Sequence, residues 1–168
     1  ASIIRCFMHS TANLSVEHLQ EILEIARLFA VTDDLDVLLH RIASSATTLL
    51  KCERASIFVH DADDDTLWTR IALGSSTIRV PRSSGIVGAS FSNNEVVRAG
   101  NAYADPRFNA EPDRKTGFVT RDVVAVPMVD LNRKPIGVVE AINKSEGCFS
   151  DLDVTMLQLL ADQGGVAL

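Results

Sequence analysis

The chain has 168 residues, of which 46% are hydrophobic, and this is enough for one full core, so we expect a single domain. Its net charge of −6, without a run of lysine or arginine, argues against nucleic acid and anionic membrane surfaces as partners. No apolar run approaches the ~20 residues that a membrane span requires.

Helical periodicity marks the first part of the chain. Residues 1–14 are expected to be an N-terminal extension or linker, followed by one domain over residues 15–168. Apolar residues recur at intervals of three and four in residues 15–31, which predicts a helix. The carboxylates of Asp33 and Asp34 are suited to cap a second helix that extends to about residue 50.

Beyond the second helix the hydrophobic period changes to two, which is typical of strands. Short turns between such strands favour antiparallel pairing. The acidic turn after the first strand lacks the spacing of a calcium-binding loop, so no metal site is expected. The alternation predicts strands at residues 54–60, 66–72, 77–80, 123–129 and 136–143.

Two further helices complete the expected order. One begins at Gly85 and ends near Gly100, and the last begins at Ser150. We therefore expect an α/β domain of the α+β kind, with a central antiparallel sheet of about six strands. Helices from both ends of the domain should cover one face of that sheet. The other face is left for the segment in between.

Residues 101–121, called the cap below, are a poor core segment because aromatic side chains alternate with charged side chains and turn formers. A long irregular connection inside a small domain is usually a lid or a binding loop. We therefore expect the cap to lie over the free face of the sheet and to close a pocket there.

The chain lacks the motifs of common enzymes. It has no GxSxG elbow, no phosphate-binding lysine loop and no HExxH, and its four histidines are not placed as pairs. Cys6, Cys52 and Cys148 are odd in number and widely separated. They argue against a disulfide framework or a zinc site and for a reducing, cytoplasmic location. Binding without catalysis is the favoured interpretation.

Several short motifs, in order along the chain, resemble those of a GAF domain, and specifically of the cyclic-nucleotide-binding GAF domains of phosphodiesterases and some adenylyl cyclases. The most specific is Asn143-Lys144, followed by Phe149 and Asp153, although Val154 replaces the last acidic residue of the signature. Supporting matches occur at residues 53–56, 78–81, 85–88, 101–109 and 116–121.

This resemblance implies the GAF fold and a salt bridge between Lys144 and Asp153 that holds the last helix to the sheet. It also implies backbone contacts from Ile86 and Val87 to a cyclic phosphate, at a helix start that suits an anion without lysine. The full set of implied ligand contacts is Arg54, Ser56, Ala72, Leu73, Ile86, Val87, Phe108, Asn109, Ala110, Asp113, Thr116, Thr120 and Glu140.

The resemblance further implies a regulatory domain, not itself an enzyme, that controls an attached phosphodiesterase or cyclase. Its ligand would be a cyclic nucleotide, with no further cofactor. Leu73 stands where guanine-selective relatives place Asp, while Arg54 and Ser56 suit adenine N1 and N6, so cAMP is expected over cGMP. The wide apolar faces of the terminal helices predict a homodimer. The alternative is a dimerisation module that binds no nucleotide. A sulfoxide reductase of this family would need cysteines in the pocket.

Overall fold

The computed structural model describes residues 14–31, 33–73 and 77–168. The predicted N-terminal extension therefore lies largely outside the described residues, and so does most of the connection between the strands predicted at residues 66–72 and 77–80. In chain order the elements are α2 (Val16–Val31), α3 (Leu35–Leu50), β1 (Cys52–Asp61), β2 (Thr66–Ala72), β3 (Arg79–Pro81), α4 (Gly85–Asn93), β4 (Val97–Ala99), the short 3-10 helix η1 (Ala102–Ala104), α5 (Glu111–Thr116), β5 (Val123–Val129), β6 (Pro135–Lys144) and α6 (Asp151–Ala167).

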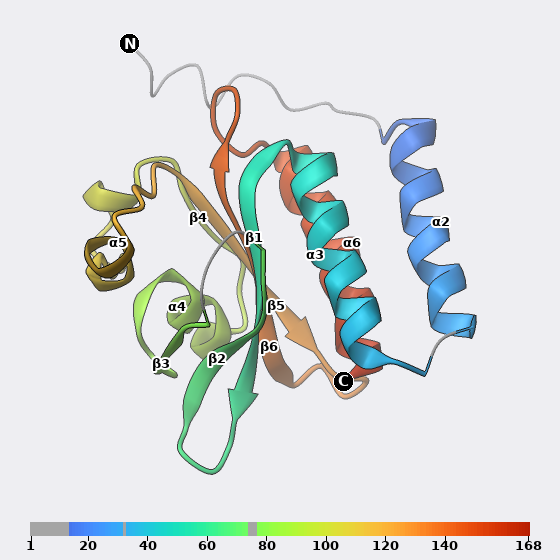
Figure 1. Ribbon diagram of the computed structural model, residues 1–168, viewed down its shortest axis with the longest axis horizontal. Helices are drawn as coiled ribbons and strands as arrows, with labels where there is room; N and C mark the ends of the chain where they lie inside the picture. The colour runs from blue at the N-terminus through green and yellow to red at the C-terminus, as the bar shows by residue number, and fades with distance from the viewer. Residues whose placement is uncertain (1–13, 32, 74–76) are drawn as a thin grey trace.

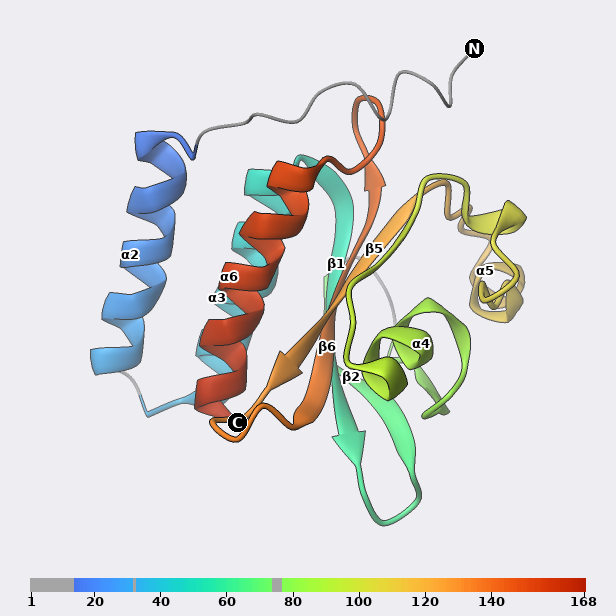
Figure 2. The ribbon, with the colours of Figure 1, turned by 180° about the vertical axis from the view of Figure 1, so that it is seen from behind.

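Within the described residues, six strands form one antiparallel sheet in the order β3-β2-β1-β6-β5-β4. Helices α3 and α6 cover one face, and α2 lies outside them as a further layer (Figure 1). Helices α4 and α5 lie on the opposite side, as the view from behind also shows (Figure 2). The predicted α+β architecture, with terminal helices on one face and the cap on the other, is confirmed.

The helix termini follow from capping side chains that the sequence already displays. Asp34 Oδ1 accepts hydrogen bonds from the backbone N–H groups of Asp36 and Val37, at 3.0 and 3.2 Å, and so begins α3. Ser150 and Asp153 form a capping box at the start of α6. Both predicted helix starts are confirmed.

The sheet separates two hydrophobic cores. The larger core lies under α3 and α6 and includes the fully buried Leu39, Ile42 and Leu157, and the smaller lies under α4. Helix α6 approaches β5 closely because residue 165 is glycine. A Cβ atom at Gly165 would lie 2.1 Å from the Val129 carbonyl oxygen.

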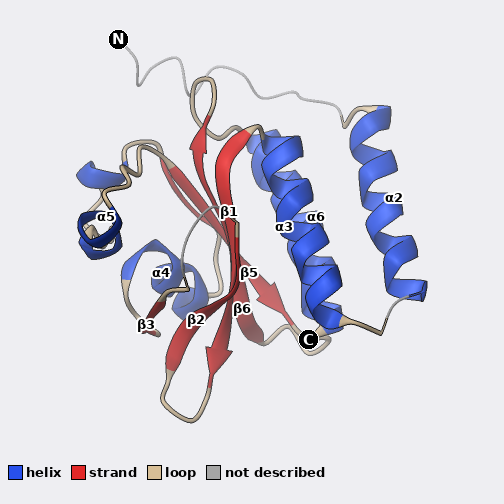
Figure 3. Ribbon diagram, viewed as in Figure 1, coloured by secondary structure: helices blue, strands red, loops and turns tan. Residues whose placement is uncertain are grey.

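The prediction of one helix from residue 85 to near residue 100 is wrong. Helix α4 ends at Asn93, and Asn94 adopts a left-handed backbone conformation with φ of 52°. The chain then forms the edge strand β4, which pairs with β5 (Figure 3). Val97 and Ala99 are buried on one face while the residue between them is exposed, so the local period is two.

The cysteines differ from expectation in one respect. Cys52 is a free, buried thiol, and burial raises its pKa to about 12. Cys148 is disulfide-bonded, so the argument against disulfides is wrong for this residue, and Cys6 lies outside the described residues. This bond removes the argument for a reducing compartment that rested on the cysteine count. In the part of the chain that the structure describes, no helix is both long and apolar enough to cross a bilayer.

Candidate functional site

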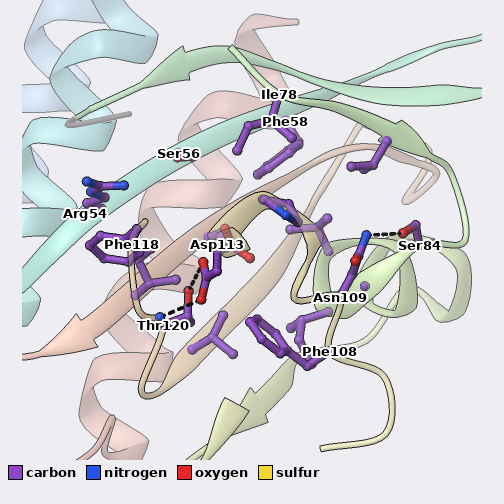
Figure 4. A pocket seen from close by; sticks show the side chains of 18 of the residues that line it. Arg54, Ser56, Phe58, Ile78, Ser84, Phe108, Asn109, Asp113, Phe118 and Thr120 are labelled. Carbon is purple, nitrogen blue, oxygen red and sulfur yellow. Dashed lines mark hydrogen bonds between the residues drawn. The ribbon is translucent and has the colours of Figure 1, made fainter. Parts of the chain in front are cut away.

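A cavity of about 100 Å³ lies between the sheet, the start of α4 and the cap (Figure 4). Strands β1 and β6 form its floor. Most of the contact residues predicted from the sequence line it, and these are Arg54, Ser56, Ile86, Val87, Phe108, Asn109, Asp113, Thr116, Thr120 and Glu140. The cap therefore covers a hollow on the sheet, at the place that the sequence predicted.

Three predicted contact residues do not line the cavity. Ala72 lies opposite Ser56 across the β1–β2 pair, half-buried beside the cavity. Ala110 is the N-cap residue of α5. Leu73 packs against the larger core, on the helix-covered side of the sheet. Because its side chain is directed away from the cavity, the identity of residue 73 does not indicate which base the cavity prefers.

Several lining residues were missed. Phe58 and Ile142 continue the alternation of Arg54 and Ser56 on β1 and of Glu140 on β6, so period two alone would have identified them. The other missed residues come from β3 and the residue before it, the N-cap and start of α4, the cap and β5. Only the fold brings these segments together, and the residues are Ile78, Val80, Ser84, Gly85, Pro112, Phe118 and Val123.

The floor of the cavity carries two polar side chains from adjacent strands. Ser56 and Glu140 lie directly opposite each other in the β1–β6 register. Within the described residues, neither the Ser56 hydroxyl nor the Glu140 carboxyl has a hydrogen-bond partner. Burial raises the pKa of Glu140 to about 7, and the nearby negative charge of Asp113 contributes to the shift.

The cap is held closed by a buried carboxylate. Asp113 on α5 accepts hydrogen bonds from the Thr120 N–H at 2.7 Å, the Thr120 hydroxyl at 2.9 Å and the Tyr103 hydroxyl at 2.8 Å (Figure 4 shows the two from Thr120). The bond to Asp113 raises the pKa of Tyr103. The polar groups of Asp113 and Thr120 that were expected to bind ligand are thus already paired with each other.

Two further contacts join the cap to the walls. The Arg54 guanidinium on β1 stacks over the Phe118 ring, 3.6 Å from the ring centroid, in a cation–π contact. The Asn109 side-chain amide donates to the Ser84 hydroxyl at 3.2 Å, just before α4. Thr116 is exposed, and its hydroxyl donates to the Pro112 carbonyl at 2.9 Å.

The start of α4 offers backbone N–H groups to the cavity. Ile86 and Val87 belong to the first turn, where the helix itself supplies no acceptors. Gly88 permits the chain before the helix to lie against it, since a Cβ atom there would be 2.5 Å from the Ser83 carbonyl carbon. An anionic group of a ligand would be stabilised at this helix start.

Behind the cavity, the end of β6 organises the segment that follows the cap. Lys144 Nζ lies 2.8 Å from Asp153 Oδ1 and 2.8 Å from the Leu50 carbonyl oxygen, so the expected salt bridge between β6 and α6 is present. The buried Asn143 side chain accepts from the Arg121 N–H at 2.6 Å and donates to the Val119 carbonyl at 2.9 Å.

Comparisons with known proteins match this architecture. Residues 34–168 match the family model described as the GAF domain. A probable 3',5'-cyclic phosphodiesterase of Caenorhabditis elegans is 31% identical over 162 residues, which are 88% of this chain and 22% of that protein. The cGMP-specific 3',5'-cyclic phosphodiesterase of Drosophila virilis is 29% identical over 154 residues, covering 81% of this chain and 17% of that protein. The chain thus spans about a fifth of the length of such relatives.

Solved structures show the same fold at lower sequence identity. The GAF domain of an Acinetobacter phosphoenolpyruvate-protein phosphotransferase superposes with a TM-score of 0.79 at 22% identity, covering 90% of this chain and 92% of that one. A free methionine-R-sulfoxide reductase from Neisseria meningitidis gives 0.77 at 20% identity, covering 95% and 93%. The second likeness is one of fold alone. Neither Cys52 nor Cys148 lines the cavity of the present chain.

Proposed function

This chain belongs to the GAF domain family, and from that premise we propose that it is the regulatory, cyclic-nucleotide-binding domain of a cyclic nucleotide phosphodiesterase. The observation that carries the proposal is the capped cavity, in which a helix start suited to an anion faces a polar floor made by Ser56 and Glu140. The relatives named as phosphodiesterases are several times longer than this chain, which supports an attached catalytic domain.

The cavity is small for such a ligand. Its volume of about 100 Å³ lies below the roughly 300–1,000 Å³ that is usual for pockets holding drug-sized ligands. Entry of a nucleotide therefore requires the cap to move away from the sheet. The contacts that must change are the Arg54–Phe118 stack and the hydrogen bonds of Asp113. A cap that changes position with occupancy is the differential interaction that a regulatory domain needs.

The expected preference for cAMP over cGMP is not supported. It depended on Leu73, with Arg54 and Ser56 on the base side. The side chain of Leu73 packs on the far side of the sheet, and similar proteins are named as cGMP-specific phosphodiesterases. We propose cGMP as the preferred ligand. Guanine presents two adjacent donors, N1–H and N2–H, and the floor of the cavity carries a carboxyl group with no partner among the described residues.

Calorimetric titration of the chain with cGMP, cAMP and 5'-GMP tests this function. We expect binding of the cyclic nucleotides, with cGMP the tighter at pH 8. The variant Ser56→Leu fills the floor and should weaken binding by at least tenfold, whereas Ser92→Leu, an exposed change on α4 outside the cavity, should not. Absence of any nucleotide binding by a folded chain would reject the proposal.

A second candidate function, dimerisation without a ligand, is favoured by the outer surface of α2. Val16, Leu19, Leu23 and Val31 are exposed there, and α2 forms the outermost layer in Figure 1. Helix α6, which was expected to share this role, packs its buried residues against α3 and β5, and Val166 is a large apolar residue exposed on it. Sedimentation of Leu19→Glu and Leu23→Glu against the parent chain would show whether α2 joins two copies.

A further inference from the structure

Two carboxyl groups face the cavity from opposite sides, and they have very different surroundings. Asp113, from the cap, accepts three hydrogen bonds. Glu140, from the floor, accepts none among the described residues, and the charged side chain that acts on its pKa is Asp113. A carboxyl group that is desolvated beside another negative charge, without donors of its own, holds its proton to a higher pH. This description fits Glu140.

Among the residues that the structure describes, no cation pairs with Glu140 in the cavity. From β1, the Arg54 guanidinium lines the cavity but stacks on Phe118. From α5 the facing charged group is Asp113. From the start of α4, β3 and β5, and from the rest of the cap, the lining residues are uncharged. These surroundings raise the pKa of Glu140 to about 7, so its two protonation states exchange near neutral pH.

The two protonation states of a carboxyl group recognise different hydrogen-bonding edges. An ionised carboxylate has two acceptor oxygens and no donor, while the neutral acid offers one donor and one acceptor. The guanine edge has two neighbouring donors, N1–H and N2–H, which match the carboxylate. The adenine edge has the N6 donor beside the N1 acceptor, which matches the neutral acid.

We propose that Glu140 is a proton-linked specificity residue, which selects guanine when it is ionised and adenine when it carries a proton. This inference rests on the proposed function, because it assigns a role within the same cavity. Ser56, directly opposite Glu140 on β1, lies within the same part of the floor and supplies a hydroxyl that can accept from or donate to the remaining base atom.

The proposal fixes the direction of the pH dependence for each nucleotide. Binding of cGMP requires the ionised group, so its affinity should rise about tenfold from pH 6 to pH 8 and then level off. Binding of cAMP requires the neutral group, so its affinity should fall about tenfold over the same range. The ratio of the two affinities should therefore change about a hundredfold. At pH 6 cGMP should release close to one proton, and at pH 8 cAMP should take one up.

The test measures both dissociation constants at pH 6, 7 and 8, in two buffers of different ionisation enthalpy that report proton release. Glu140→Gln should make both affinities independent of pH, and the exposed Glu24→Gln, on α2, should leave the opposite slopes intact. Opposite slopes that vanish in Glu140→Gln support the proposal. If the affinities for both nucleotides change with pH in the same direction, the carboxyl group contacts a part that they share, such as the ribose hydroxyl. If neither affinity changes with pH, the carboxyl group does not contact the ligand. Either result overturns the proposal.

A measurement without nucleotide separates this inference from the proposed function. The folded pKa of Glu140 is raised above its ordinary value of 4.5 to about 7, so the parent chain should lose stability as pH rises between these values. The urea midpoint of the parent chain, compared with that of Glu140→Gln, should fall from pH 5 to pH 7. A constant difference would refute the proton-holding role even if cGMP binds. Failure of any nucleotide to bind, with the midpoint shift present, would instead defeat the proposed function and the specificity role that rests on it.

Discussion

Replacing Thr120 by valine should loosen the cap without unfolding the domain. Thr120 is buried, and valine keeps its shape while removing the hydroxyl that donates to Asp113 at 2.9 Å. A hydrogen bond to a charged group contributes about 1.5–3 kcal/mol. Asp113 keeps its bonds from the Thr120 N–H and from Tyr103, so the loss should be about 2 kcal/mol for opening of the cap.

Amide hydrogen exchange measures this loss directly, because the cap opens more readily than the two cores. A cost of about 2 kcal/mol corresponds to roughly 30-fold faster exchange of the amide at position 120 and of the Gly117 amide, which bonds the Asp113 carbonyl at 2.8 Å. Amides of β5 should be unaffected. Thr48→Val, whose exposed hydroxyl bonds only a helix carbonyl, is the control. Exchange within threefold of the parent chain would refute the role that we give Thr120 in holding the closed cap.

Three other outcomes are expected. Lys144→Met leaves the buried Asp153 carboxylate without its cation, so the urea-derived free energy of unfolding should fall by roughly 3–5 kcal/mol. A second change, Asp153→Leu, removes the unpaired charge and should restore part of this loss, less about 1 kcal/mol for the capping box that Asp153 forms with Ser150. A loss below about 1 kcal/mol for the single variant would contradict the buried-charge argument. Gly88→Ala forces α4 away from Ser83 and should weaken nucleotide binding more than it lowers the thermal midpoint; an unchanged affinity would show that the helix start is not used. Bound cGMP should slow amide exchange across residues 101–121, and unchanged exchange there would exclude cap movement on binding.

Much of the fold follows from local patterns in the sequence. The spacing of apolar residues placed α2 and α3, and period-two alternation gave β2 and β5 with their observed bounds. Capping side chains at Asp34 and Ser150 marked the helix starts. These features are predictable because backbone hydrogen bonding and side-chain direction act over only a few residues.

Errors occurred where a local pattern competed with distant contacts. Strand β4 has three residues, too few for its alternation to be recognised, and it exists because the edge of β5 is available for pairing. The bond of Cys148 and the outward direction of Leu73 likewise depend on parts of the chain far away in sequence.

The sequence by itself determined which elements form, which family the motifs resemble and which segment covers the sheet. Only the tertiary structure decided the surroundings, and therefore the charge, of the carboxyl groups that line the cavity. Among the described residues, Glu140 on β6 has no hydrogen-bond donor, whereas Asp113 across the cavity has three. One of these three is the hydroxyl of Thr120, which is thereby used to hold the cap. The charge on a carboxyl group depends on the desolvation and the neighbours that folding supplies, and residues 27 positions apart in the chain become such neighbours only across the closed cavity.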